Sequence, residues 1–98
     1  MMVYIDQDFK SIVPAYIKHI RKQVNEINQL LPHRQYKEIE RLAIQIKDSG
    51  DNYGFIEIGQ FGLKLIYLSG LEAYEQIQRT TLEIIQYLES CEIRYVEL

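Results

Sequence analysis

Only a few side chains in this protein could act as nucleophiles or metal ligands. The chain of 98 residues has two histidines, His19 and His33, and one cysteine, Cys91. Two histidines exclude a three-histidine metal site within one chain, and one cysteine excludes a disulfide framework or a zinc site with several thiolates. The carboxylates are scattered over predicted outer faces without a convergent pair, so hydrolase chemistry has no support. We therefore expect no bound metal and no cofactor.

Charge and hydrophobicity exclude further classes of protein. Lysine and arginine total 11 against 14 aspartates and glutamates, for a net charge of −3, so nucleic acid is not an expected partner. The longest apolar run, residues 63–68, is too short to span a membrane. The N-terminus lacks the basic and then apolar pattern of a signal peptide. We expect a single cytoplasmic domain over residues 1–98.

The spacing of apolar residues is helical along nearly the whole chain. One stripe runs from Phe9 to Leu31, and Pro14 either kinks this helix or lies in the first turn of a new one. Further helices are predicted over residues 35–49, 55–69 and 71–90, although residues 55–58 resemble a strand locally. Short turns between amphipathic helices imply antiparallel neighbours. We therefore predict an all-α, up-down antiparallel four-helix bundle with a short C-terminal tail, residues 92–98, which could be extended and cover one end.

Glycine and aspartate mark the expected helix ends. Asp6 or Asp8 can cap the start of the first helix. Gly50 is predicted to be the left-handed cap at the end of the second helix. Gly59 and Gly62 each cost a helix roughly 1 kcal/mol relative to alanine. We expect the missing side chains to permit a close approach to a neighbouring helix.

One isoleucine of the second helix lies on its charged side. At about 100° per residue, Ile44 is roughly 150° from the centre of the apolar stripe. It shares its face with Lys37, Arg41 and Asp48, and Lys47 flanks it. We therefore expect Ile44 to be exposed, either as an isolated surface residue without a role or as the centre of a contact surface.

The third helix has apolar residues outside its core stripe. Ile56, Leu63 and Tyr67 follow the spacing i, i+7, i+11, which forms one line along a helix. Two interpretations remain open. The line is buried by a partner or by a second copy of the chain, or the third helix is simply the most central helix of the bundle.

Residues 42–55, LAIQIKDSGDNYGF, resemble the signature of histidine phosphotransfer (HPt) domains, roughly L-G/A-H-x-L-K-G-S-G-x-x-Y-G-F. Leucine, alanine, lysine, Ser-Gly and Tyr-Gly-Phe match in register. Further elements of the family resemble three other segments of the chain: residues 12–17, Phe61-Gly62 with Leu65, and residues 86–88. The resemblance implies a four-helix bundle of a two-component phosphorelay. In that family, a single exposed histidine on the second helix accepts a phosphoryl group from a receiver domain and passes it on.

The sequence departs from this pattern at the site of the chemistry. Ile44 stands at the position of the phosphorylated histidine, and isoleucine has no nucleophilic atom. Gln45 is no substitute, because an amide nitrogen is not nucleophilic. Asp48 replaces the family glycine that lets the receiver approach, whereas Lys47, which the family is thought to use to orient phosphate, is retained.

These departures lead to one main hypothesis and two alternatives. The main hypothesis is a binding module, not an enzyme, that contacts a response-regulator receiver domain or a histidine kinase without carrying phosphate. Its expected contact surface comprises Lys37, Arg41, Ile44, Gln45, Lys47 and Asp48, with the adjoining first helix. The first alternative is an active phosphocarrier that uses His33, in the turn after Pro32, or His19, beside the inward face of the first helix. The second is a homodimer formed through Ile56, Leu63 and Tyr67.

Overall fold

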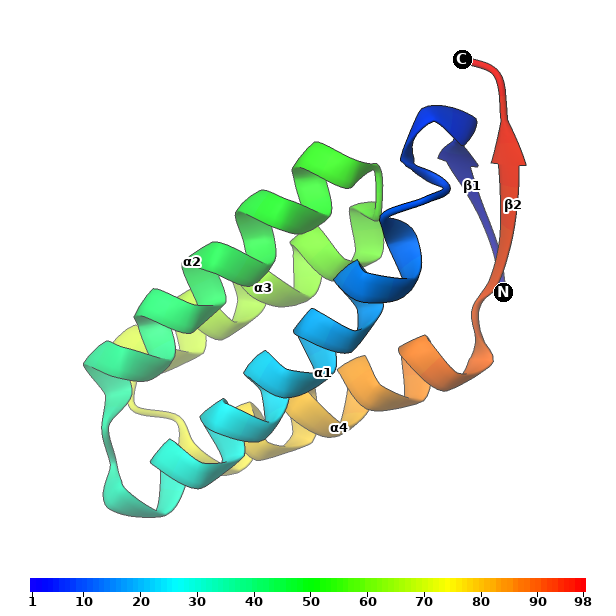
Figure 1. Cartoon of the computed structure of the whole chain (residues 1–98). Helices are drawn as coiled ribbons and strands as arrows, with labels where there is room; N and C mark the ends of the chain where they lie inside the picture. The colour runs from blue at the N-terminus through cyan, green and yellow to red at the C-terminus, as the bar shows by residue number, and fades with distance from the viewer.

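The protein folds as a helical bundle. A computed structural model describes all residues, 1–98, and contains four long helices packed alongside one another (Figure 1). Their bounds are Val13–Leu30 (α1), Tyr36–Tyr53 (α2), Ile56–Gly70 (α3) and Tyr74–Ser90 (α4). Two short 3₁₀ helices, η1 (Gln7–Phe9) and η2 (Leu31–His33), precede and follow α1. The predicted all-α bundle is confirmed, with the addition of a small pair of terminal strands.

The apolar stripes read from the sequence form one core. Twenty buried hydrophobic residues make up a single cluster to which every long helix contributes. The fully buried members on the helices include Ile20, Val24, Ile27, Ile39, Ala43, Ile46, Ile58, Leu65, Ile77 and Ile84. Because the cluster is continuous, each helix has one face turned inward and one face left for solvent or partners.

Two expected helix starts need correction. The side chain of Asp6 accepts a hydrogen bond from the backbone N–H of Asp8, but it caps η1 and not α1. The helix α1 begins at Val13 with Pro14 in its first turn, where the missing N–H costs nothing. The helix α4 begins at Tyr74 rather than at residue 71, because Glu72 has a left-handed backbone with φ 52 that no helix can continue.

The prediction that Gly50 ends the second helix is wrong. The helix α2 continues to Tyr53, and Gly54, with φ 82, is its left-handed cap. The two glycines are only four residues apart, and the apolar stripe that ends at Ile46 favoured the first of them. Gly50 instead lies inside the helix and is buried.

Glycines bring α2 and α3 into close contact. A Cβ added at Gly50 would lie 2.5 Å from the backbone nitrogen of Gly59, and one added at Gly62 would lie 2.5 Å from the backbone nitrogen of Lys47. No real Cβ fits at these distances, so only glycine permits this packing. The close approach expected for Gly59 and Gly62 is confirmed.

The two ends of the chain meet in a small parallel sheet. Strand β1 (Met2–Asp6) pairs with strand β2 (Glu92–Val96), with Val3 opposite Ile93 and Ile5 opposite Tyr95. Val3 and Ile5 are buried in the common core. The extended C-terminal tail is therefore confirmed, and it stands with β1 at one end of the bundle (Figure 1). Val3 and Ile5 alternate with exposed residues, and this alternation indicates a strand. It was not used to predict β1.

None of the four helices combines the length and the apolar composition that crossing a membrane requires.

The glycine contact predicts a sharp difference between two alanine variants. We expect Gly62→Ala to lower the free energy of unfolding by about 2 kcal/mol or more, because the new methyl group must push α2 and α3 apart. Gly70→Ala is the matched control, since a Cβ at Gly70 meets nothing within 4 Å. Urea unfolding followed by circular dichroism measures both. Equal stability of the two variants would contradict the close packing.

Candidate functional site

The outer face of α2 presents one apolar side chain among charges. Ile44 is 42% exposed, so the prediction that it points to solvent is confirmed. The core residues Leu42, Ala43 and Ile46 are at most 3% exposed and face the other way. Lys37, Arg41 and Asp48 are exposed on the same helix.

Two of the charged residues around Ile44, Arg41 and Lys47, are paired within α2 itself. The guanidinium of Arg41 donates to Glu38 at 3.0 Å, and the Nζ of Lys47 donates to the Oδ2 of Asp51 at 3.0 Å. The hydrogen bond with Asp51 raises the pKa of Lys47 above its usual value. These contacts leave Ile44 as an apolar centre whose rim carries little net charge. They also engage Lys47, the lysine that the HPt signature associates with phosphate.

A hollow of about 360 Å³ lies between α1 and α2 next to this face. It is lined by His19, Gln23, Gln45, Asp48, Ser49, Asn52 and Tyr53. Gln45 therefore belongs to the wall of the hollow, where its Oε1 accepts a hydrogen bond from the Nε2 of Gln23 at 2.9 Å. The structure brings two predicted contact residues, Gln45 and Asp48, together with an exposed histidine of α1.

Gln23 is a residue of the site that the sequence analysis missed. Its side chain is only 3% exposed, and its Oε1 has no hydrogen-bond partner within the chain. The signal was present in the sequence, because Gln23 lies beside Ile20 and Val24 in the apolar stripe of α1. A buried amide with one unsatisfied oxygen is costly, and it marks the α1–α2 contact as more polar than the rest of the core.

Aromatic side chains close one end of the hollow. The rings of Tyr16 and Tyr53 meet edge to face with centroids 5.0 Å apart, and the ring of Phe9 packs on Tyr53 at 5.5 Å. Ser49 Oγ lies 3.2 Å from the hydroxyl oxygen of Tyr16. Burial raises the pKa of Tyr16 to about 12, because the folded protein disfavours the charged phenolate.

The other two reactive side chains lie outside this region. His33 is exposed in η2, beyond the far end of α1 and about 20 Å along the helix axis from His19. Cys91 follows α4, and partial burial raises the pKa of its thiol. Neither residue lines the hollow between α1 and α2.

The third helix carries a second exposed apolar surface. Ile56 is 64%, Leu63 54% and Tyr67 68% exposed. The interpretation that α3 is the most central helix is therefore wrong, since its second apolar line faces solvent. The role of this line in contacting a partner stays a prediction.

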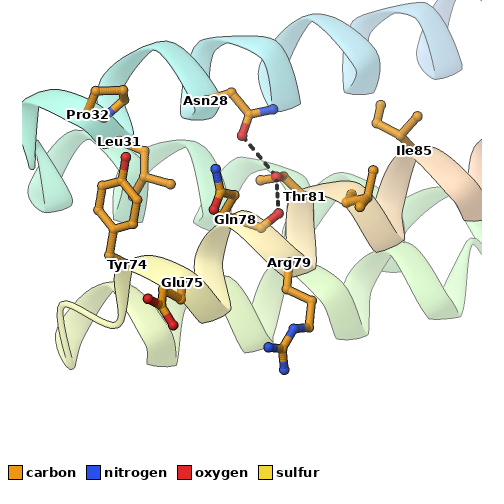
Figure 2. Close-up of a pocket in the computed structure, with 10 residues that line it drawn as sticks. Asn28, Leu31, Pro32, Tyr74, Glu75, Gln78, Arg79, Thr81 and Ile85 are labelled. Carbon is orange, nitrogen blue, oxygen red and sulfur yellow. Dashed lines mark hydrogen bonds between the residues drawn. The ribbon is translucent and has the colours of Figure 1, made fainter.

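A larger groove, of about 570 Å³, lies where the end of α1 and η2 meet α4 (Figure 2). The Oγ1 of Thr81 lies 2.9 Å from the Oδ1 of Asn28 and 2.8 Å from the carbonyl oxygen of Gln78. Figure 2 shows Arg79 pointing away from the other lining side chains, and Glu75 is the other charged residue of the lining. It contains none of the residues that the sequence analysis selected.

The comparisons with known proteins assign no family to this chain. No model of a known protein family matches the sequence, and no curated protein or solved structure is significantly similar to it. Within the structure, no three His, Cys, Asp or Glu side chains gather closely enough to hold a metal ion. The site must therefore be interpreted from its own residues.

Burial of Tyr16 predicts a loss of stability in alkali. The folded pKa of about 12 exceeds the ordinary value of 10.0, so the folded state disfavours ionisation. The contribution of Tyr16 to the free energy of unfolding should then be constant below about pH 10 and fall as the pH rises towards 12. Tyr87, whose pKa burial also raises, adds to this fall.

Tyr16→Phe separates the contribution of Tyr16. Urea unfolding at pH 9, 10, 11 and 12 should show a shallower decline for this variant than for the wild type. Tyr4→Phe, at a site 59% exposed, should keep the wild-type decline. The idea fails if Tyr16→Phe and Tyr4→Phe behave alike.

Proposed function

We propose that this protein is an HPt-like binding module of a two-component phosphorelay that contacts a partner through α2 and carries no phosphate. The observation that supports this most directly is the 42% exposure of Ile44 in the middle of α2. The resemblance of residues 42–55 assigns this position to the phosphorylated histidine. An apolar side chain there can form a contact but cannot accept a phosphoryl group.

The arrangement of the helices is compatible with this proposal. Four helices of 15 to 18 residues are joined by short connections, which favour the antiparallel up-down order of an HPt-like bundle. The proposed partner is a response-regulator receiver domain or a histidine kinase, and the proposed location is the cytoplasm.

The surroundings of Ile44 favour binding over chemistry. Asp48 places an exposed carboxylate one turn after Ile44, where it would repel an incoming phosphoryl group. Lys47 is paired with Asp51, and this carboxylate competes with phosphate for the lysine. An apolar centre with a polar rim is the usual composition of a protein contact.

One observation favours a second candidate, a phosphocarrier that uses His19. This histidine is exposed and lines the hollow with Gln45 and Asp48, directly beside the proposed contact surface. His33 has no such position. An acid-labile phosphate label that disappears in His19→Ala and persists in His33→Ala would establish this candidate.

Binding to isolated partner domains tests the main proposal. The labelled protein is titrated with each receiver domain and each histidine kinase of the source genome, the receivers both free and activated with beryllofluoride. We expect one of them to bind, and we expect Ile44→Glu to weaken that binding at least tenfold by placing a charge at the apolar centre. Because Arg41 and Lys47 are already paired, the affinity should depend only weakly on salt.

Leu82→Glu is the matched control for the binding test. Leu82 is 58% exposed on α4, outside the proposed surface, so its replacement should leave the affinity unchanged. Phosphorylated receivers should transfer no stable label to the protein. The proposal is wrong if no receiver or kinase binds, or if Ile44→Glu binds as tightly as Leu82→Glu.

Restoring the missing side chains provides an independent test of the scaffold. We expect the double variant Ile44→His with Asp48→Gly to accept acid-labile phosphate from the receiver that binds the wild type. An exposed imidazole is nucleophilic near neutral pH, and the glycine removes both the bulk and the charge of Asp48. The single variant Ile44→His should accept less. No label on the double variant, despite receiver binding, would show that the surface does not present residue 44 to the phosphoryl group.

A further inference from the structure

The exposed apolar line on α3 is longer than its three predicted members. Leu71, directly after the helix, keeps a helical backbone and is 58% exposed. At about 100° per residue, Ile56, Leu63, Tyr67 and Leu71 fall within an arc of about 80°, and Gln60 lies in the same arc. We call these five residues the α3 stripe. It extends along the whole outer side of the helix.

The spacing within the α3 stripe is that of a helix-pairing seam. Residues 56, 60, 63, 67 and 71 are separated by steps of four, three, four and four, which resemble the a and d positions of a coiled coil. One of these positions is polar, Gln60. A single amide within such a seam commonly sets the register of the pair.

The pattern is also symmetric about a point between residues 63 and 64. Reversing the helix about this point superimposes Ile56 on Leu71, Gln60 on Tyr67, and Leu63 on the adjacent position, Lys64. A twofold axis perpendicular to α3 would therefore match the stripe with itself in antiparallel orientation. In that pairing the Gln60 amide meets the Tyr67 hydroxyl of the second copy, so both polar groups can be satisfied at once.

Charges beside the α3 stripe are engaged within their own chain. The Nζ of Lys64 lies 3.6 Å from Glu83 of α4, and the hydroxyl of Tyr87 donates to Glu57 at 3.4 Å. On the other side, Lys47 is bound to Asp51. No charged residue belongs to the stripe itself, so a second stripe can approach without burying an unpaired charge.

The exposed area is close to what a weak dimer requires. From their exposed fractions, the four apolar side chains present roughly 500 Å² of surface, within the range of the largest apolar patch of a typical monomer, which is often a functional one. Two copies would bury about 1,000 Å² in total, near the lower limit for a specific interface. A second copy of the chain is thus an occupant of the right size and shape.

We propose that α3 is a homodimer interface, in which two copies of the protein pack their α3 stripes antiparallel about a twofold axis near Leu63. The α3 stripe shares no residue with the proposed receiver contact on α2 or with the hollow between α1 and α2. The dimer would present two copies of the α2 face at once.

Sedimentation equilibrium of the full chain tests whether the dimer exists. Over total concentrations of roughly 10 μM to 1 mM, suited to an interface of this size, the wild-type mass should rise from one chain towards two. Leu63→Glu should weaken the association at least tenfold, because it replaces the central apolar side chain of the α3 stripe with a charge that the interface must desolvate. The matched control Leu82→Glu, at a site of similar exposure on α4, should associate like the wild type.

Cysteine cross-linking tests the orientation of the two helices. In a background with Cys91→Ser, Leu63→Cys should oxidise to a disulfide-linked dimer, because the two copies of this residue lie together on the axis. Ile56→Cys should not cross-link with itself, since its two copies would lie roughly 20 Å apart along the helices. A mixture of Ile56→Cys and Leu71→Cys should form the heterodimer.

Three results would overturn the proposal. A monomeric mass throughout the concentration range would exclude the dimer, and a dimer unaffected by Leu63→Glu would place the interface elsewhere. Efficient self-cross-linking of Ile56→Cys would exclude the antiparallel arrangement. Because Leu63 is 54% exposed, the variants should stay folded, and their circular dichroism verifies this.

Discussion

The backbone contact between α2 and α3 is the constraint on which the rest of the surface depends. Gly50 meets Gly59, and Gly62 meets the backbone of Lys47, at distances that admit no side chain. This contact holds both helices at one rotation about their axes. On α2 it leaves Ile44 facing solvent and turns Gln45 and Ser49 towards α1. On α3 it leaves the α3 stripe uncovered. Both candidate interaction surfaces are therefore consequences of the same close packing.

The two surfaces differ in physical character. The α2 face has one apolar residue, internally paired charges and a polar hollow with a histidine, which suits a specific contact with a folded partner. The α3 stripe is apolar, symmetric and lined by charges that already have partners. Under the two proposals, one contact selects a partner and the other pairs the chain with itself.

The sequence predicted the features that depend on helical periodicity. The exposure of Ile44 and the second apolar line of α3 follow from residue spacing along single helices, and the close approach at Gly59 and Gly62 was inferred from the cost of glycine within a helix. Of the two strands, only the extended C-terminal segment was predicted. The partner of β1 is remote in the sequence, since Met2 pairs with Glu92. The role of Gly50 was misread, because a glycine that caps a helix and one that packs against a neighbouring helix look alike without the neighbour. The bonding partner of Gln23 was invisible for the same reason, since Gln45 lies on another helix.

By itself, the sequence determined which side of each helix is apolar and which side meets solvent, because a period of about 3.6 residues sets the direction of every side chain around its own axis. It also determined that position 44 has no nucleophile, because that is a matter of residue type. The tertiary structure alone decided which residues of different helices stand together. His19 joins Gln45 and Asp48 at one hollow, Gly50 faces Gly59, and the two chain ends form one sheet. These associations depend on how helices rotate and pack against one another, and that is settled by the fit of the whole core rather than by any local pattern.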